Sequence, residues 1–235
     1  MDLSLQRPET RMPRHEVVQG LLALFEAPRY LEIGVSRGGT FHAVRAAEKV
    51  AVDPRFRFDV AEAERANPAA RYHQVTSDRY FGEIVDPDER FDLVYLDGLH
   101  TAEQTLRDLL NALSYLKPDG IVVIDDVKPV TALAAIPDRA TFARVREYLG
   151  SPAKAWMGDV YKVVWFIETF LQQLSWRTVE ENHGQAVVWR RRRGEVRPRT
   201  IQEVGQLSFE RFVTEIATLR ITPYAEILAA IRAER

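Results

Sequence analysis

Five short apolar runs, each ending beside a glycine or an acidic residue, constrain the fold of this 235-residue chain more than any other feature. They cover residues 29–35, 49–54, 71–78, 91–98 and 120–126. Most of these runs do not alternate apolar and polar residues as a half-exposed strand does. Continuous apolar runs are typical of strands buried on both faces of a parallel sheet. Helical segments between them imply right-handed crossovers, so the sequence predicts a doubly wound, mostly parallel α/β sheet.

The clearest predicted helix lies between the fourth and fifth runs. Thr101 and Gln104 form a capping-box pattern at its start, and "KPDG" at 117–120 ends it. Five leucines at helical spacing predict one face that packs on the sheet: Leu106, Leu109, Leu110, Leu113 and Leu116.

The remaining elements are predicted from shorter patterns. Residues 1–14 have two prolines and five charges before any periodic pattern, which indicates a loose arm. The other predicted elements are a helix at 15–25, a tight turn feeding a helix at 36–49, a helix at 57–67, helices at 138–149 and 159–174, an antiparallel hairpin around "HG" at 183–184, and two closing helices split near Pro223.

Bulk composition bounds the function classes. Apolar residues make up 46% and charged residues 28%, the net charge is −2, and there is no cysteine. A small net charge predicts no nucleic-acid or membrane partner, and the one basic run, 190–193, is expected to be a solvated strand end. Absence of cysteine excludes disulfides, thiolate metal sites and cysteine nucleophiles. The charged start lacks a signal-peptide pattern and no apolar stretch approaches about 20 residues, so a cytoplasmic protein is expected.

The length suits one α/β domain over residues 1–235. We divide it into an N-terminal arm and helix (1–28), a catalytic core (29–192) and a C-terminal helical extension (193–235). The terminal helices are also candidates for an interface between copies of the chain.

Acids and glycines gather at the carboxyl ends of the predicted strands, where open parallel sheets bind ligands. Read in strand order, they are Glu32, Gly34, Gly38 and Gly39, then Asp53, then Asp78, then Asp97 and His100, then Asp125 and Asp126. Such a series predicts a site along this edge. The plainer alternatives stay open: glycines that ease turns, an Asp97 that caps the next turn, and an "IDD" that is a polar strand exit.

The glycine loop "EIGVSRGG" and Asp53 together indicate a nucleoside ligand. Glycines let the backbone approach a ligand, and Asp53 follows Gly34 by 19 residues, a position from which a carboxylate can accept ribose hydroxyls. This pattern alone does not choose between a dinucleotide and S-adenosylmethionine. The absent G-x-G-x-x-G spacing weakens the dinucleotide interpretation.

"YLEIGVSRGGTF", "VAVDP" and "TSD" resemble the cofactor motifs of class I S-adenosylmethionine-dependent methyltransferases. "LDGLHTAEQTLRDL" and "LKPDGIVVIDD" are similar to the metal-dependent macrocin or sugar O-methyltransferase group, and more distantly to catechol-type O-methyltransferases. The resemblance spans about residues 29–190. It implies a Rossmann-like, seven-stranded sheet with one antiparallel strand, and terminal helices that cap the substrate pocket.

The resemblance also implies roles for single residues. Glu32, Gly34 and Gly38 would line the methionine and ribose side of S-adenosylmethionine, Asp53 would hold the ribose hydroxyls, and Asp78 would lie near the adenine. Asp97, Asp125 and Asp126 fall on metal-ligand positions. His100 falls on the general-base position.

Elementary electrostatics agrees with a cation at the acidic positions. Three converging carboxylates repel one another unless a cation compensates them, and all-oxygen ligation with open positions suits Mg²⁺ or another divalent cation. A neutral imidazole at His100 has a pKa suited to accepting a proton near neutral pH.

The expected activity is Mg²⁺-dependent methyl transfer from S-adenosylmethionine to a hydroxyl of a small molecule, with a sugar of a natural product as the favoured acceptor. A catechol-type O-methyltransferase, an NAD-linked oxidoreductase and a non-catalytic cofactor-binding protein remain alternatives. Trp156, Tyr161 and Trp165 are assigned equally to the acceptor pocket or to core packing. The other histidines, His15, His42, His73 and His183, are interpreted as structural.

Overall fold

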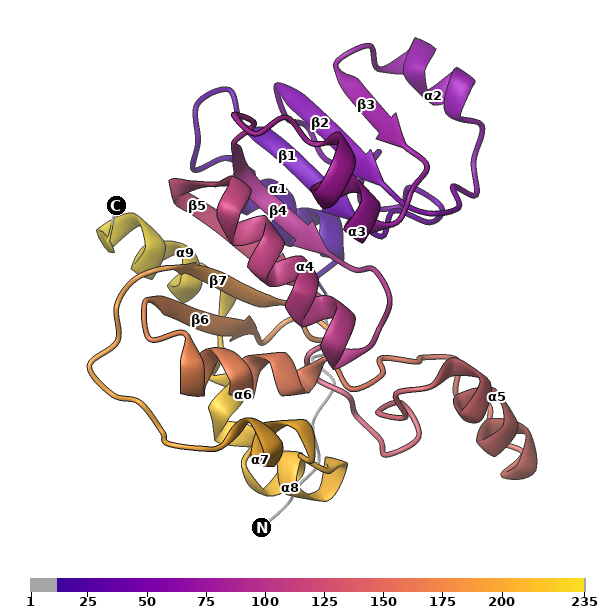
Figure 1. Ribbon diagram of the computed structural model, residues 1–235, viewed down its shortest axis with the longest axis vertical. Coiled ribbons are helices and arrows are strands. Elements are labelled where there is room, and N and C mark those ends of the chain that lie inside the picture. Colours follow the sequence, from indigo (N-terminus) through magenta and orange to yellow (C-terminus); the bar gives the residue numbers. More distant parts are fainter. Residues whose placement is uncertain (1–11, 235) are drawn as a thin grey trace.

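An eight-stranded sheet forms the centre of the computed structural model, which describes residues 12–234 (Figure 1). Its strand order is β3-β2-β1-β4-β5-β7-β6-β8. The strands are β1 Arg29–Ile33, β2 Glu48–Val52, β3 Ala70–His73, β4 Phe91–Leu96, β5 Leu116–Ile124, β6 Leu174–Val179, β7 Ala186–Arg190 and β8 Ile221–Thr222. Only the pairings of β7 with β5 and with β6 are antiparallel among the described strands, which confirms the predicted mostly parallel α/β sheet and the hairpin.

The predicted count of seven strands is wrong by one. The two-residue strand β8 pairs in parallel with the end of β6. Arg220, in the left-handed region at φ 51°, turns the chain just before β8. The amide of Thr178 then donates to the Arg220 carbonyl, and the amide of Glu180 donates to the Thr222 carbonyl. Such an edge pairing follows from where the C-terminal segment docks, which no local sequence pattern encodes.

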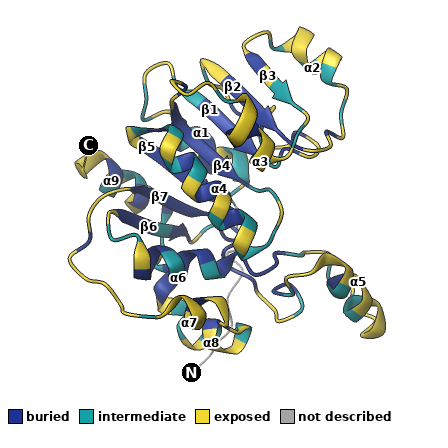
Figure 2. Ribbon diagram, in the orientation of Figure 1, coloured by how far each residue is buried: buried dark blue, intermediate teal, exposed yellow. Residues whose placement is uncertain are grey.

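Helices cover both faces of the sheet, so its central strands are buried (Figure 2). The helices are α1 Arg14–Leu22, α2 Val60–Ala66, α3 Ser77–Arg79, η1 Tyr80–Ile84, α4 Ala102–Tyr115, α5 Arg139–Tyr148, α6 Tyr161–Phe170, α7 Ile201–Gly205, α8 Phe209–Thr214, η2 Ile216–Leu219 and α9 Tyr224–Glu234. One apolar cluster joins one face of the sheet to η1, α4, α6, α7 and α8. A second cluster joins the other face to α1 and α9. No helix among residues 12–234 combines the length and apolar character needed to cross a membrane.

Helix α4 is confirmed, but not all of the leucine stripe lies on its buried face. Thr105, Leu109 and Ala112 are buried at i, i+4 and i+7, whereas Leu110 is 44% exposed. Leu116 is buried, but it begins β5 and does not extend the helix. Leu106, Leu109 and Leu113 still pack in the apolar cluster, so Leu110 is the helix leucine that leaves the predicted face.

The helix predicted within residues 36–49 is absent, and turns replace it. The buried ammonium of Lys49 explains the difference. Its Nζ lies 2.6 Å from the Phe41 carbonyl oxygen and 3.0 Å from that of Val44, and it donates to both. These carbonyls would have to accept amide protons if a helix continued, so the side chain satisfies them in its place.

The C-terminal segment does not cap the ligand-binding edge as the resemblance implied. The chain does break near Pro223, after which α9 begins, but residues 200–235 contain more elements than two helices. Helix α9 packs beside α1, where the Tyr224 hydroxyl donates to the Val17 carbonyl at 2.6 Å. Helices α7 and α8 pack on the other face, near α6. By contrast, α5 stands away from the body of the molecule on two loops (Figure 1).

The basic run after β7 is not wholly solvated. Arg193 is buried, and its guanidinium donates to the carbonyls of Leu174 and Ile167 at 2.7 and 2.9 Å. It therefore satisfies carbonyls at the end of α6 and the start of β6, and it is not available to a nucleic-acid ligand.

Candidate functional site

A cleft of about 1440 Å³ lies at the carboxyl ends of the central parallel strands. It exceeds the roughly 300–1,000 Å³ usual for one ligand, so it can hold a cofactor and an acceptor together. The cofactor candidates Glu32, Gly34, Asp53 and Asp78 line it, as do Asp97 and His100. Gly38 does not line it: this residue is buried in the turn, against the ring of His42.

The first glycine of the loop is required by the fold itself. Gly34 has φ 88°, and a Cβ built there would lie 2.0 Å from the Asp97 carbonyl oxygen. A side chain at this position would therefore separate the loop after β1 from the end of β4. Gly34 thus sets the distance between the cofactor loop and the acidic residues of the neighbouring strand.

Two buried acids, Glu32 and Asp53, lie beside the glycine loop that follows β1. Asp53 accepts the backbone amides of Ser36 and Arg55 at 2.8 and 2.7 Å, which ties the loop to the end of β2. A carboxylate offers about four lone-pair sites, so Asp53 retains acceptor capacity toward ligand hydroxyls. Glu32 accepts the Tyr30 hydroxyl at 2.6 Å. Burial raises the pKa of Glu32 to about 8, although the Tyr30 hydrogen bond acts to lower it.

Asp78 lies in α3, after β3, and lines the same cleft. Its carboxylate accepts from Gln104 at 3.1 Å and from Arg107 at 2.9 Å. The Gln104 hydrogen bond, followed by Arg107, lowers the pKa of Asp78. The Gln104 side chain therefore donates to Asp78 and does not bond to the backbone of Thr101. Of the predicted capping box, only the hydrogen bond from the Gln104 amide to the Thr101 hydroxyl forms.

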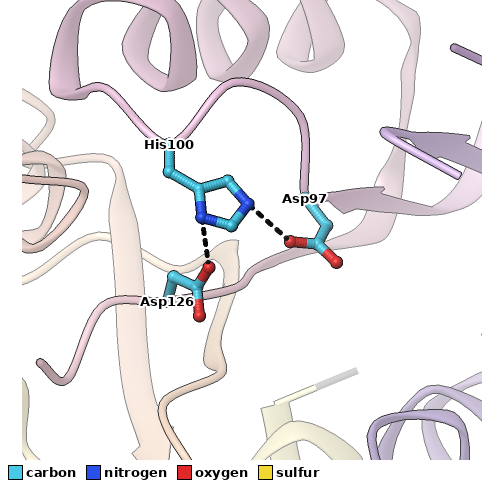
Figure 3. Close-up of side chains that lie close together, drawn as sticks. All are labelled: Asp97, His100 and Asp126. Carbon is cyan, nitrogen blue, oxygen red and sulfur yellow. Dashed lines mark ion pairs between the residues drawn. The ribbon is translucent and has the colours of Figure 1, made fainter. Parts of the chain in front are cut away.

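Asp97, His100 and Asp126 converge from two strand ends (Figure 3). His100 Nε2 lies 3.4 Å from Asp97 Oδ1, and His100 Nδ1 lies 2.8 Å from Asp126 Oδ2. Asp126 has φ 61°, an uncommon conformation for a non-glycine residue that often marks a functional site. The loop after β4 and the exit of β5 together form this group.

The protonation of the group follows from its burial and charges. Burial raises the pKa of Asp97 to about 7, and the negative charge of Asp125 adds to the rise. Burial acts to lower the pKa of His100, but the adjacent carboxylates of Asp126 and Asp97 outweigh it and raise that pKa to about 11. These carboxylates favour the imidazolium form of His100, whereas the sequence analysis expected a neutral ring.

Asp125 lies beside this group but has other partners. Its Oδ2 accepts the Tyr95 hydroxyl at 2.8 Å and contacts the Arg14 guanidinium, and its Oδ1 lies 3.0 Å from His183 Nε2. Burial opposes ionisation of Asp125, yet His183, Arg14 and Tyr95 outweigh it and lower the pKa. The predicted acidic triad is therefore arranged as two overlapping groups that share Asp126.

Two residues that the sequence argument did not assign to the site take part in it. His183, interpreted as structural, lies in the turn between β6 and β7 and contacts Asp125. Arg14, the last residue of the predicted loose arm, begins α1 and contacts the same carboxylate; residues 1–11 of that arm lie outside the described residues. The predicted antiparallel hairpin was a usable signal, because its turn must lie at the carboxyl edge when β6 runs parallel to β5.

Trp156 belongs to the cleft, but the other two aromatic candidates belong to the core. Its ring stacks on His100, with centroids 4.9 Å apart and planes 12° from parallel. Its indole N–H donates to the Ile136 carbonyl at 2.7 Å. Tyr161 and Trp165 are buried away from the cleft lining, and the Tyr161 hydroxyl donates to the Leu207 carbonyl.

Comparisons with known proteins agree with this fold. Residues 31–127, less than half of the chain, match a family model described as a methyltransferase domain. A Staphylococcus aureus structure described as a caffeoyl-CoA O-methyltransferase is 13% identical, with a TM-score of 0.53 over 77% of this chain and 86% of that one. Cofactor-bound Rv0187 from MTB is 18% identical, with a TM-score of 0.50 over 81% of this chain and 86% of that one. No match was found among curated protein sequences. The chain therefore has a Rossmann-like α/β methyltransferase fold, with a methyltransferase domain match over its first five strands.

Proposed function

We propose that this chain transfers a methyl group from S-adenosylmethionine to a hydroxyl of a small molecule. One observation carries the proposal: a glycine loop with a buried acid at the ends of β1 and β2 shares a cleft with a histidine–carboxylate group at the ends of β4 and β5. The first half suits a nucleoside, and the second suits activation of a hydroxyl. The methyltransferase match over residues 31–127 supports the same activity.

The cofactor would lie along the loop after β1. Asp53 is held by two backbone amides, so its remaining lone pairs are fixed toward ribose hydroxyls without a cost in side-chain entropy. Gly39 leaves open space where a Cβ would project, so the loop can approach a ligand closely there. Glu32 presents a buried carboxyl to the same region of the cleft.

We propose that Asp97 and Asp126 hold Mg²⁺ or a similar divalent cation, with Asp125 as a third acidic group. Asp125 Oδ1 and Asp126 Oδ2 are buried oxygens that face histidine nitrogens without the alignment of a hydrogen bond. Hard oxygen donors that lack aligned donors of their own fit a hard cation. When bound, such an ion supplies Lewis acidity toward a substrate hydroxyl.

His100 is placed to take the proton that the hydroxyl loses as the O–CH₃ bond forms and the S–CH₃ bond breaks. It can do so only as a neutral imidazole, which requires the charge of Asp97 and Asp126 to be compensated. Stacking on Trp156 and the backbone carbonyl of Trp156, 3.0 Å from Nδ1, fix the ring orientation. The remaining nitrogen, Nε2, is then the one directed to Asp97.

For the acceptor we propose a sugar hydroxyl. The resemblance of "LDGLHTAEQTLRDL" and "IDD" to the sugar O-methyltransferase group supports this choice. A catechol-type acceptor remains the alternative within the same chemistry, because both present neighbouring oxygens to a divalent ion.

Calorimetry with S-adenosylhomocysteine and with NAD tests the cofactor assignment. We expect saturable binding of S-adenosylhomocysteine and none of NAD; the reverse would assign the cleft to a dinucleotide enzyme. Mn²⁺ binding, followed by electron paramagnetic resonance, tests the metal assignment. Asp126→Asn should weaken Mn²⁺ by tenfold or more while the affinity for S-adenosylhomocysteine stays unchanged.

Asp138→Asn is the matched control for Asp126→Asn, since Asp138 is an exposed acid that caps α5. It should leave Mn²⁺ binding intact. Methyl transfer that continues at full rate in EDTA would remove the metal from the mechanism, and a His100→Gln variant with full turnover would remove His100 as the proton acceptor.

A further inference from the structure

The part of the cleft lining that residues 139–156 contribute carries only positive charge. The lining that residues 139–156 contribute consists of Arg139, Phe142, Ala143, Arg146, Lys154 and Trp156, with three cations and no acid. The acids of the lining all come from the strand-end half. No ion pair within residues 12–234 involves these three cations, whereas Arg107, Lys117 and Lys162 each pair with a carboxylate.

These cations lie near the candidate proton acceptor. The Arg139 guanidinium carbon is 5.6 Å from the centre of the Trp156 ring. The same ring stacks on His100, with ring centroids 4.9 Å apart. Trp156 therefore lies near both Arg139 of α5 and His100, and all three side chains line the same cleft.

Helix α5 presents two arginines along one face. Arg139 and Arg146 are seven residues apart, which places them two turns apart on the same side at a rise of roughly 10 Å. The Arg146 guanidinium carbon lies 6.0 Å from the ring of Phe142, the one buried side chain of this helix. Phe142 anchors the face, and the two guanidinium groups flank it.

We propose that the acceptor is anionic, and that Arg139, Arg146 and Lys154 bind its phosphate or carboxylate while its hydroxyl lies beside His100. The proposal rests on the proposed methyl transfer and narrows its substrate to a sugar that carries an acidic substituent. Guanidinium groups bind both carboxylate and phosphate oxygens through paired N–H donors. Unpaired cations on one wall of a cleft also raise the local concentration of an anionic ligand.

Calorimetry on the full chain, saturated with S-adenosylhomocysteine and Mg²⁺, tests this with three probes: glucose 6-phosphate, glucuronate and neutral glucose. We expect at least one anion to bind at least tenfold more tightly than glucose, with an affinity that falls as NaCl rises from about 0.05 to about 0.5 M. Tighter binding of glucose 6-phosphate assigns a phosphate; tighter binding of glucuronate assigns a carboxylate.

Arg146→Gln and Arg144→Gln form a matched pair on the same helix. Arg144 is exposed, lies outside the cleft lining and donates to Thr141 Oγ1. Arg146→Gln should weaken the anion by about tenfold, and Arg144→Gln by less than twofold. Equal effects of the two variants, or glucose binding as tightly as both anions, would overturn the proposal. The affinity for S-adenosylhomocysteine is measured first. If S-adenosylhomocysteine does not bind, the proposed function is overturned; if it binds but the anions do not, only the proposal of an anionic acceptor is overturned.

Discussion

Substitution of Gly158 by alanine tests how the segment after α5 supports the candidate base. Gly158 has φ 61°, and a Cβ built there would lie 1.6 Å from the His100 carbonyl oxygen. Its amide donates to the Ala134 carbonyl at 3.0 Å, so the glycine is held from its other side. An alanine can be accommodated only if the His100 backbone or the 157–159 segment moves.

Two contributions set the expected magnitude. A non-glycine residue in the left-handed region costs about 1 kcal/mol. Carbon and oxygen atoms that are not bonded stay about 3 Å apart or more, so the backbone must move by more than 1 Å, and overpacking of this kind costs about 1–3 kcal/mol. We expect Gly158→Ala to lower the free energy of unfolding by about 2–4 kcal/mol. Displacement of His100 by about 1 Å should also lower turnover by about 100-fold.

Gly150→Ala is the matched control. Gly150 also lies in the left-handed region, at φ 57°, but no heavy atom lies within 4 Å of the position that a Cβ would occupy. It should therefore show only the backbone cost of about 1 kcal/mol and retain turnover. Urea unfolding of both variants, with methyl transfer measured alongside, separates the two contributions. Unfolding free energies that agree within about 0.5 kcal/mol, with equal turnover, would refute the steric argument.

Three further perturbations test the fold. Leu109→Ala should lower the free energy of unfolding by about 2–5 kcal/mol and Leu110→Ala by about 0.5 kcal/mol or less, because only Leu109 is buried; equal urea midpoints would contradict the observed face of α4. Lys49→Met should cost about 1–3 kcal/mol in the same assay by leaving two turn carbonyls unpaired, and a neutral result would mean that the turn does not need the ammonium. Burial opposes ionisation of Glu215, but hydrogen bonds from Arg211 and Arg199 outweigh it and lower the pKa from 4.5 to about 2. The contribution of ionised Glu215 to the free energy of unfolding is therefore complete above pH 4.5 and is lost as the pH falls toward 2. We expect this contribution to be about 2 kcal/mol, because partial exposure screens the ion pairs. In urea unfolding measured across this pH range, Glu215→Gln should remove the loss of stability.

The carboxyl-edge site was predictable from local sequence because of one topological rule. Parallel strands end at the same edge, so polar residues that directly follow buried strands must lie near one another. Asp53, Asp97 and Asp126 all follow such strands, Glu32 is the next-to-last residue of β1, and the structure places all of them at that edge. The α4 cap by Thr101 was likewise local, since it depends on residues three positions apart.

Other features were decided by contacts between distant residues. The turn at 36–47 has a sequence that permits a helix, but the Lys49 ammonium of the next strand satisfies its carbonyls. Leu110 fits an apolar stripe, yet it is exposed while Leu109 is buried. Local pattern states which faces are apolar, and packing decides which of them is buried.

By itself, then, the sequence determined the sheet and the strand-end positions of Asp97, His100 and Asp126, because burial and chain direction act over a few residues. Only the tertiary structure brought Arg14 and His183, which lie far apart in the sequence, to the same carboxylate, Asp125. It also decided that Asp125 and Asp97 belong to different groups. Charge pairing depends on distances of a few ångströms, which only the packing of α1 and the β6–β7 hairpin against β5 establishes.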